Sequence, residues 1–153
     1  MTQDRPVLKL SERPTPEFPM RLSPLAAWHD AVAANDLSHI DDLLADDAVF
    51  QSPAVRTPQV GKALVAKYLR AAMVVLNNDS FRYVDAWEGP DSAVLEFEVT
   101  LGGVYVNGVD LIRWNSEGLI VQFKVMLRPL KALNAVIPMM GRELERAAAD
   151  RMD

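Results

Sequence analysis

The stretch that decides the fold is VYVNGVDLIRW, residues 104–114. Alternate side chains of a β-strand share a face, so this stretch presents two different rows. One row is apolar apart from a single carboxyl group: Val104, Val106, Gly108, Asp110, Ile112 and Trp114. The other row is mixed: Tyr105, Asn107, Val109, Leu111 and Arg113. The pattern predicts a strand with one face against a core and with Asp110 set in that face.

The alternation continues on both sides of this stretch. It predicts strands over residues 81–88, 93–101, 104–114 and 119–127, separated by Gly-containing turns that favour antiparallel hairpins. In the last of these strands, one uniformly apolar row is expected: Leu119, Val121, Phe123, Val125 and Leu127. The Asn107-Gly108 pair could close a tiny hairpin, but a bulge inside the long strand is the preferred interpretation.

The first half of the chain has a helical period instead. Ser23 and Pro24 suit the start of a helix that runs to Asn35, and a short helix capped by Ser38 follows. A short strand over 48–51 and a longer helix from about residue 60 to 76 come next. Pro129 precedes a terminal helix that Pro138 is expected to kink or divide. Helices followed by hairpin strands predict an α+β fold with a pocket between the sheet and the helices.

Three regions are predicted along the chain. Residues 1–22 form an extension interrupted by four prolines, which either drapes across the domain or forms a loose tail. Residues 23–128 form the main domain. Residues 129–153 form a helical segment that could act as a lid over the pocket or as a dimer contact.

Composition excludes several functions. The 153 residues include no Cys and two His, so we expect no disulfide, no metal site and no cofactor. A net charge of −5 argues against nucleic acid and anionic membranes as partners. The longest apolar run, residues 71–76, is too short to cross a membrane, and no leader is recognisable. These features predict a cytoplasmic protein.

Asp110 is the residue that most strongly indicates chemistry. Burial disfavours the charged form of a carboxyl group, so the pKa of Asp110 should be raised. A carboxyl that is neutral near pH 7 can donate a hydrogen bond to a ligand oxygen or carry a proton. The alternative is a structural role, in which a backbone amide, Arg56 or Arg128 satisfies the carboxylate.

Several ordered segments resemble a known family: NDL at 35–37, LADDAVF at 44–50, Pro53, Gly61, Tyr68 and VDLIRWN at 109–115. Together they are similar to the nuclear transport factor 2-like superfamily, in its SnoaL-like and ketosteroid isomerase-like branch. The resemblance implies an α+β cone in which three N-terminal helices pack into a strongly curved antiparallel sheet, here with an extra C-terminal helix. It also implies a homodimer.

The resemblance also implies roles for individual residues. Asp110 matches the protonated acid of the isomerase-like oxyanion hole. The base position is occupied by Ser52 and the tyrosine position of the first helix by Trp28. A serine hydroxyl cannot accept a proton unaided, which argues against steroid isomerase activity.

Other residues are expected around a ligand, although an ordinary core would use many of the same types. The predicted ligand-binding set is Trp28, His29, Ser52, Tyr68, Phe97, Phe123, Val125 and Leu127. The predicted function is binding of a small hydrophobic molecule, with Asp110 as its catalytic or anchoring group in a reaction of isomerase, dehydratase or cyclase type. A non-catalytic binding module or dimeric assembly module of the same fold remains open.

Overall fold

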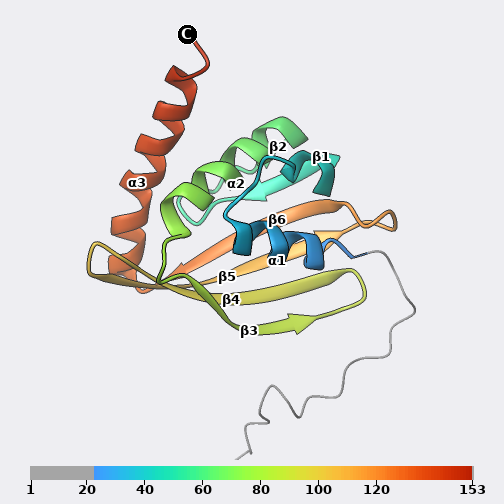
Figure 1. Ribbon diagram of the computed structural model, residues 1–153, viewed down its shortest axis with the longest axis horizontal. Helices are drawn as coiled ribbons and strands as arrows, with labels where there is room; N and C mark the ends of the chain where they lie inside the picture. The colour runs from blue at the N-terminus through green and yellow to red at the C-terminus, as the bar shows by residue number, and fades with distance from the viewer. Residues whose placement is uncertain (1–22, 153) are drawn as a thin grey trace, which may run out of the picture.

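The computed structural model describes residues 23–152, and the Pro-rich extension predicted over residues 1–22 lies outside the described residues. Figure 1 shows the elements in chain order. They are α1 (Leu25–Ala34), the 3₁₀-helix η2 (Ile40–Leu43), β1 (Leu44–Gln51), β2 (Gln59–Val60), α2 (Lys62–Leu76), β3 (Arg82–Glu88), β4 (Ser92–Leu101), β5 (Val104–Trp114), β6 (Ile120–Arg128) and α3 (Leu130–Ala149).

The six strands form one sheet in the order β2-β1-β6-β5-β4-β3. The hairpin pairs β3–β4, β4–β5 and β5–β6 are antiparallel, as their short turns predict. The prediction of an entirely antiparallel sheet is wrong, because β1 pairs with β6 in parallel. No hairpin joins these two strands, so the local turn signals carried no information about their relative direction.

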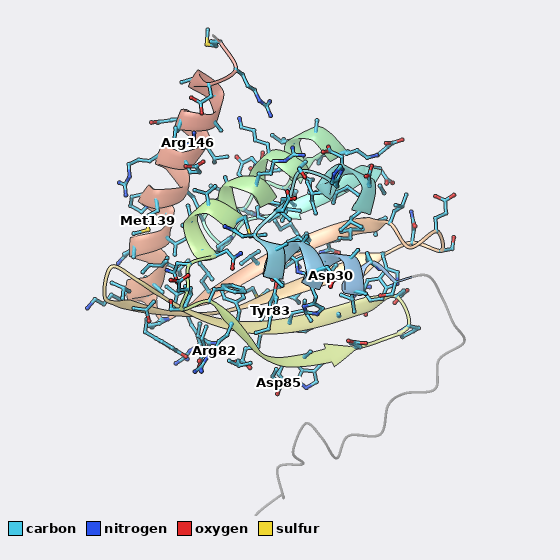
Figure 2. All side chains as sticks on the ribbon, viewed as in Figure 1. Asp30, Arg82, Tyr83, Asp85, Met139 and Arg146 are labelled. Carbon is cyan, nitrogen blue, oxygen red and sulfur yellow. The ribbon has the colours of Figure 1, made fainter. Side chains whose placement is uncertain are left out.

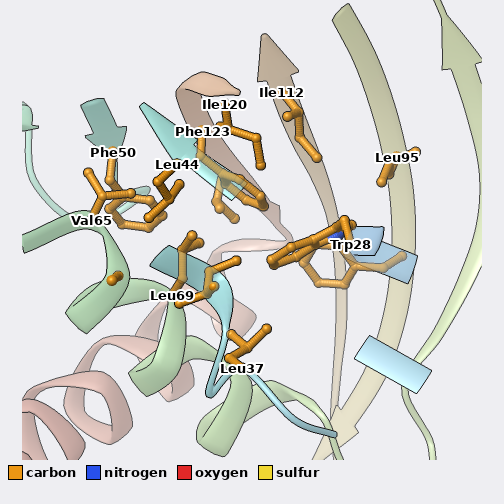
Figure 3. Packing of buried hydrophobic residues seen from close by; sticks show 14 of the residues in the cluster. Trp28, Leu37, Leu44, Phe50, Val65, Leu69, Leu95, Ile112, Ile120 and Phe123 are labelled. Carbon is orange, nitrogen blue, oxygen red and sulfur yellow. The ribbon is translucent and has the colours of Figure 1, made fainter. Parts of the chain in front are cut away.

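The helices α1 and α2 cover one face of the sheet, and α3 lies beside α2 near the start of β5 and the end of β6 (Figure 1). The core fills the space between this sheet face and the helices. Figure 3 shows Trp28 of α1 and Leu69 of α2 meeting Phe123 of β6 there. Within the described residues, no helix combines the length and apolar character needed to cross a membrane.

Two predicted elements of the first half differ from the structure. The short helix expected after Ser38 is a single 3₁₀ turn, and Leu44 belongs to β1, which starts four residues earlier than the predicted strand. The sequence of β1 does not alternate here, because the consecutive residues Asp46 and Asp47 are both exposed. The pairing of β1 with β6 shifts register at the same place. The two-residue strand β2 was not predicted.

The inward row of β6 also differs from the prediction. Ile120 is fully buried opposite Trp114, whereas the predicted row placed Leu119 and Val121 on that face. The register shifts between Arg113 and Trp114, and Val121 becomes the extra residue. A bulge of this kind changes the face on which the following residues lie. Beyond it, Phe123 and Val125 are buried as expected.

The terminal helix is neither divided nor ended by Pro138. α3 is continuous from Leu130 to Ala149 with Pro138 inside it. Proline removes the hydrogen bond to the carbonyl four residues earlier, which here belongs to Asn134. Both Asn134 and Pro138 lie on the exposed side of α3, where water can satisfy that carbonyl.

Gly108 is required by close packing and not by a bulge. It pairs regularly with Phe97 on β4 and Leu127 on β6, so the predicted bulge at Asn107-Gly108 is wrong. A Cβ atom built at Gly108 would lie 2.5 Å from Phe97 Cζ, 2.6 Å from a Leu127 methyl carbon and 2.9 Å from the Met126 carbonyl oxygen. The glycine therefore lets two large side chains meet across β5.

The variant Gly108→Ala should lower the free energy of unfolding by about 1–3 kcal/mol, because the added methyl group overpacks a filled site. The matched control is Gly141→Ala in α3, where an added Cβ meets open space. Alanine favours a helix over glycine by up to about 1 kcal/mol, so this variant should be unchanged or more stable. Urea unfolding of both variants checks the pair, and equal effects would contradict it.

Candidate functional site

Asp110 lies in the middle of β5, flanked by Leu95 on β4 and Val125 on β6. Its side chain faces the core, and only 6% of the residue is exposed. This places a carboxyl group in an apolar sheet face, as the strand pattern predicted. The strands on either side hold it, so its position does not depend on a loop.

Tyr83 of β3 is the hydrogen-bond partner of this carboxyl group. Its hydroxyl donates to Asp110 Oδ2 at 2.7 Å. The same hydroxyl accepts a hydrogen bond from the indole Nε1 of Trp28 at 3.0 Å. Tyr83 lies beneath α1 in the view of Figure 2, consistent with this contact to a helix residue. A chain of two hydrogen bonds therefore links α1, β3 and β5.

The environment shifts the pKa of both acidic groups. Burial raises the pKa of Asp110 from 3.8 to about 7, although the hydrogen bond from Tyr83 acts in the opposite direction. Burial also raises the pKa of Tyr83 well above 10, and the neighbouring negative charge of Asp110 adds to this rise. Near neutral pH, Tyr83 keeps its proton and Asp110 is present in both its neutral and its ionised form.

In the structural alternative for Asp110, Arg56 or Arg128 was expected to pair with the carboxylate. Arg128 instead donates from Nη1 to Asn107 Oδ1 at 3.3 Å, on the opposite face of β5. Arg56 is exposed in the segment between β1 and β2. Among the described residues, the hydrogen bonds therefore place Tyr83 on the carboxylate, and neither arginine neutralises it.

An inner cavity of about 50 Å³ lies between α1, α2 and the sheet, and Asp110 and Tyr83 line it. Of the predicted ligand-binding residues, Trp28, Phe97 and Phe123 line this same cavity. The Trp28 and Phe123 rings pack with their centroids 5.0 Å apart. The indole N–H of Trp28 bonds to Tyr83, so it holds the site together. Asp110 and Tyr83 are the titratable side chains of the described lining.

An outer cavity of about 200 Å³ lies between α2, α3 and the ends of β1 and β6. Three other predicted residues line it: Ser52, Tyr68 and Leu127. Val125 lines both cavities. Ser52 Oγ accepts the backbone N–H of Ala54 at 2.9 Å. The structure therefore separates the residue at the base position from Asp110 by placing them in different compartments.

His29 is the one predicted residue that lines neither cavity. It is half-buried on α1, and its ring meets the edge of Tyr83 with centroids 5.3 Å apart. His29 therefore packs behind the Tyr83 ring instead of facing the inner cavity.

Tyr83 was not among the site residues predicted from the sequence. A bulge between Tyr83 and Asp85 separates the two halves of β3, so no single alternating row runs through the strand. The available signal was the shared face of Phe81 and Tyr83 before the bulge, and both rings do pack onto Phe97. Only the pairing of β3 with β4 brings this hydroxyl to Asp110.

Among residues 23–152, no group of three or more His, Asp or Glu side chains gathers closely enough to hold a metal ion. The inner cavity is lined by the Asp110 carboxyl group, the Tyr83 hydroxyl, the Asn77 amide and apolar side chains, and the Asn77 Nδ2 already donates to the Val32 carbonyl and to Asn35 Oδ1. Such a site can donate a hydrogen bond to an oxygen atom and can exchange a proton with it.

The helices and curved sheet form the cone of the nuclear transport factor 2-like fold, with a carboxyl group inside it. Residues 25–123 match the SnoaL-like domain, which is most of the chain. The protein belongs to the SnoaL-like domain family. No curated protein matches the chain.

Two solved structures share both fold and sequence with the chain. One is described as a steroid delta-isomerase from Pseudomonas aeruginosa, with 36% identity over 84% of this chain and 90% of that chain, and a TM-score of 0.73. The other is an uncharacterised bacterial protein from Silicibacter pomeroyi, with 34% identity over 77% and 82% and a TM-score of 0.71. A third, the epoxide hydrolase/cyclase-like enzyme SalBIII of salinomycin pyran ring formation, shows the fold alone, with 18% identity over 69% and 88% and a TM-score of 0.56.

Proposed function

We propose that the protein binds a small, mostly apolar molecule through a carbonyl or hydroxyl oxygen and transfers a proton with Asp110. The observation that carries this proposal is a buried carboxyl group that lines an apolar cavity and whose described partner is a neutral hydroxyl. No fixed positive charge among the described residues of that cavity holds the carboxyl ionised. The similarity to a structure described as a steroid delta-isomerase supports a reaction of this class.

In this proposal the two carboxyl oxygens of Asp110 have different tasks. Tyr83 donates to Oδ2, which leaves Oδ1 as the oxygen that carries the proton of the neutral acid. Oδ1 can then donate this proton to a ligand oxygen. Since the pKa of Asp110 is about 7, the carboxylate that results is also a competent base at neutral pH.

A dehydration illustrates how one carboxyl group suffices. The neutral acid gives its proton to a hydroxyl group, which leaves as water when its C–O bond breaks. The carboxylate takes a proton from the neighbouring carbon, whose C–H electron pair forms the new double bond. Asp110 is thereby neutral again. An isomerisation uses the same carboxyl to remove a proton from one carbon and return it to another.

Two substitutions at Asp110 separate binding from proton transfer. Asp110→Leu should weaken binding of cyclohexenone about tenfold while leaving binding of methylcyclohexene unchanged, because only the ketone loses a hydrogen bond. Asp110→Asn retains a donor but carries no transferable proton, so it should bind cyclohexenone and lower any turnover about a hundredfold. Ligand titrations followed by NMR, and turnover assays on enones, hydroxy-ketones and epoxides, check both expectations.

The controls decide between the functions that the sequence left open. Equal ketone affinity in the Asp110→Leu variant and the parent would contradict the anchoring role. Binding that depends on Asp110, with no turnover on any substrate of the panel, would favour a non-catalytic binding module.

Homodimer formation remains a prediction that light scattering can test. Tyr105 and Met126, on the outer face of the sheet, are 45% and 52% exposed.

A further inference from the structure

We infer that the inner and outer cavities form one two-compartment site for a neutral, elongated ligand of roughly six to ten carbons that carries its oxygen at one end. The oxygen end would reach Asp110 in the inner cavity, and the hydrocarbon body would occupy the outer cavity beneath α3. This inference rests on the proposed function, because Asp110 is the group that would hold the oxygen.

The two cavities share part of their walls. Ala72 and Leu76 of α2 and Val125 of β6 line both of them. The two compartments are therefore adjacent. Ala72 has the smallest side chain of the three. A molecule that passes Ala72 would contact both compartments at once.

The chemistry of the two compartments differs. The inner cavity has the Asp110 carboxyl and the Tyr83 hydroxyl, whereas the outer cavity has no charged side chain in its described lining. Its polar side chains are Ser52 and Tyr68, and Ser52 Oγ already accepts a backbone hydrogen bond. A charged group in the outer cavity would lack a counter-charge, and its desolvation would oppose binding. The ligand body is therefore neutral and apolar.

The cavity sizes limit the length of the ligand. The inner cavity has a volume of about 50 Å³, above the roughly 10–15 Å³ that a cavity needs in order to hold one water molecule, so it has room for a small oxygen-bearing group. The outer cavity of about 200 Å³ exceeds the roughly 150 Å³ cavity that is known to accept benzene in another protein. A single ring or a medium-length chain fits these dimensions.

The helix α3 provides the far wall of the outer cavity through Val136, Met140 and Gly141. A Cβ built at Gly141 meets open space, so a larger side chain can enter this region without displacing its neighbours. The variant Gly141→Leu is thus expected to shorten the outer cavity. Gly141→Ala is the matched control, since it makes the same change in helix propensity with little added volume.

The experiment measures dissociation constants, by NMR titration, for methyl ketones from butanone to methyl decyl ketone. In the parent, affinity should rise roughly fourfold for each added methylene group until the outer cavity is filled. In Gly141→Leu, the dissociation constant of methyl octyl ketone should rise at least tenfold, and that of butanone should change less than twofold. Gly141→Ala should follow the parent. If Gly141→Leu lowers the melting temperature, Ala72→Leu, which narrows the passage, should produce the same selective loss.

The outcomes separate this inference from the proposed function. The inference is overturned if ketone affinity stops rising at methyl propyl ketone and Gly141→Leu has no effect, while the Asp110→Leu variant still loses butanone binding. That result leaves the proposed function in place. A length dependence that responds to Gly141→Leu but not to Asp110→Leu would overturn the proposed function and the assignment of the oxygen end.

Discussion

The free energy of unfolding should fall by up to about 4 kcal/mol as the pH rises from about 4 to about 8, and Asp110→Asn should remove this fall. The pKa of Asp110 is about 7 in the folded chain and is expected near its ordinary value of 3.8 in the unfolded chain. Between these values the folded state holds one more proton than the unfolded state. Stability therefore decreases with rising pH through this range and becomes constant above the folded pKa.

The measurement is urea unfolding of the parent and the variant at several pH values. Asp47→Asn is the matched control, because Asp47 is exposed on β1, and it should follow the parent. Hydrogen bonds lower the pKa of Asp36, Glu98 and Glu143. Protonation of these groups therefore lowers the free energy of unfolding toward acid pH, and it does so equally in the parent and in both variants. The difference between the Asp110→Asn curve and the parent curve therefore isolates Asp110, and parallel curves would contradict its raised pKa.

A second variant refines the same experiment. The hydrogen bond from Tyr83 lowers the pKa of Asp110 and partly offsets the effect of burial. Tyr83→Phe removes this bond, so the pKa of Asp110 should rise above about 7 and the loss of stability should extend to higher pH. Direct titration of the Asp110 side-chain carbon by NMR tests the direction of this shift.

Truncation of Phe123 to alanine should lower the free energy of unfolding by about 3–5 kcal/mol. Phe123 is 2% exposed and packs against Trp28 of α1 and Phe50 of β1. Its loss removes the ring contact between Trp28 of α1 and the centre of the sheet. The loss in free energy of unfolding should lie near about 5 kcal/mol if the space left by the Phe123 ring merges with the inner cavity and neighbouring side chains cannot fill it.

Phe123→Leu is the control, since it retains most of the apolar volume and should cost clearly less than the alanine variant. Both variants can be compared by chemical denaturation at one pH below 6, where Asp110 is mostly neutral. A loss below about 1 kcal/mol for Phe123→Ala would mean that neighbouring side chains move to fill the space, which would contradict this prediction.

Much of the fold could be predicted from the sequence because its signals are local. The strands β3–β6 are joined by short turns, so alternating apolar residues fixed their order and direction. The pairing of β1 with β6 is not local, and it escaped prediction together with its parallel direction. Bulges at Val121 and after Tyr83 escaped prediction for another reason: each moves the apolar row to the other face, which a strict two-residue period cannot describe.

The site was predicted in part for the same reason. Asp110 interrupts an otherwise apolar row within a single strand, so its position was visible in the sequence. Its partner Tyr83 lies on a strand two positions away in the sheet, and no local pattern connects them. The division of the predicted ligand-binding residues between two cavities depends on where α2 and α3 lie over the sheet. That arrangement is a property of packing and not of any one segment.

The position of β6 has a consequence for how the chain is made. Of the strands in residues 23–152, β6 is the last to be synthesised, yet it lies between β1 and β5 in the sheet. β1 is complete by residue 51 but gains its parallel partner only after residues 120–128 have been synthesised. Until then β1 and β2 can form only an isolated pair, which is marginal in water. A chain that ends before residue 120 therefore lacks the strand that joins the two halves of its sheet.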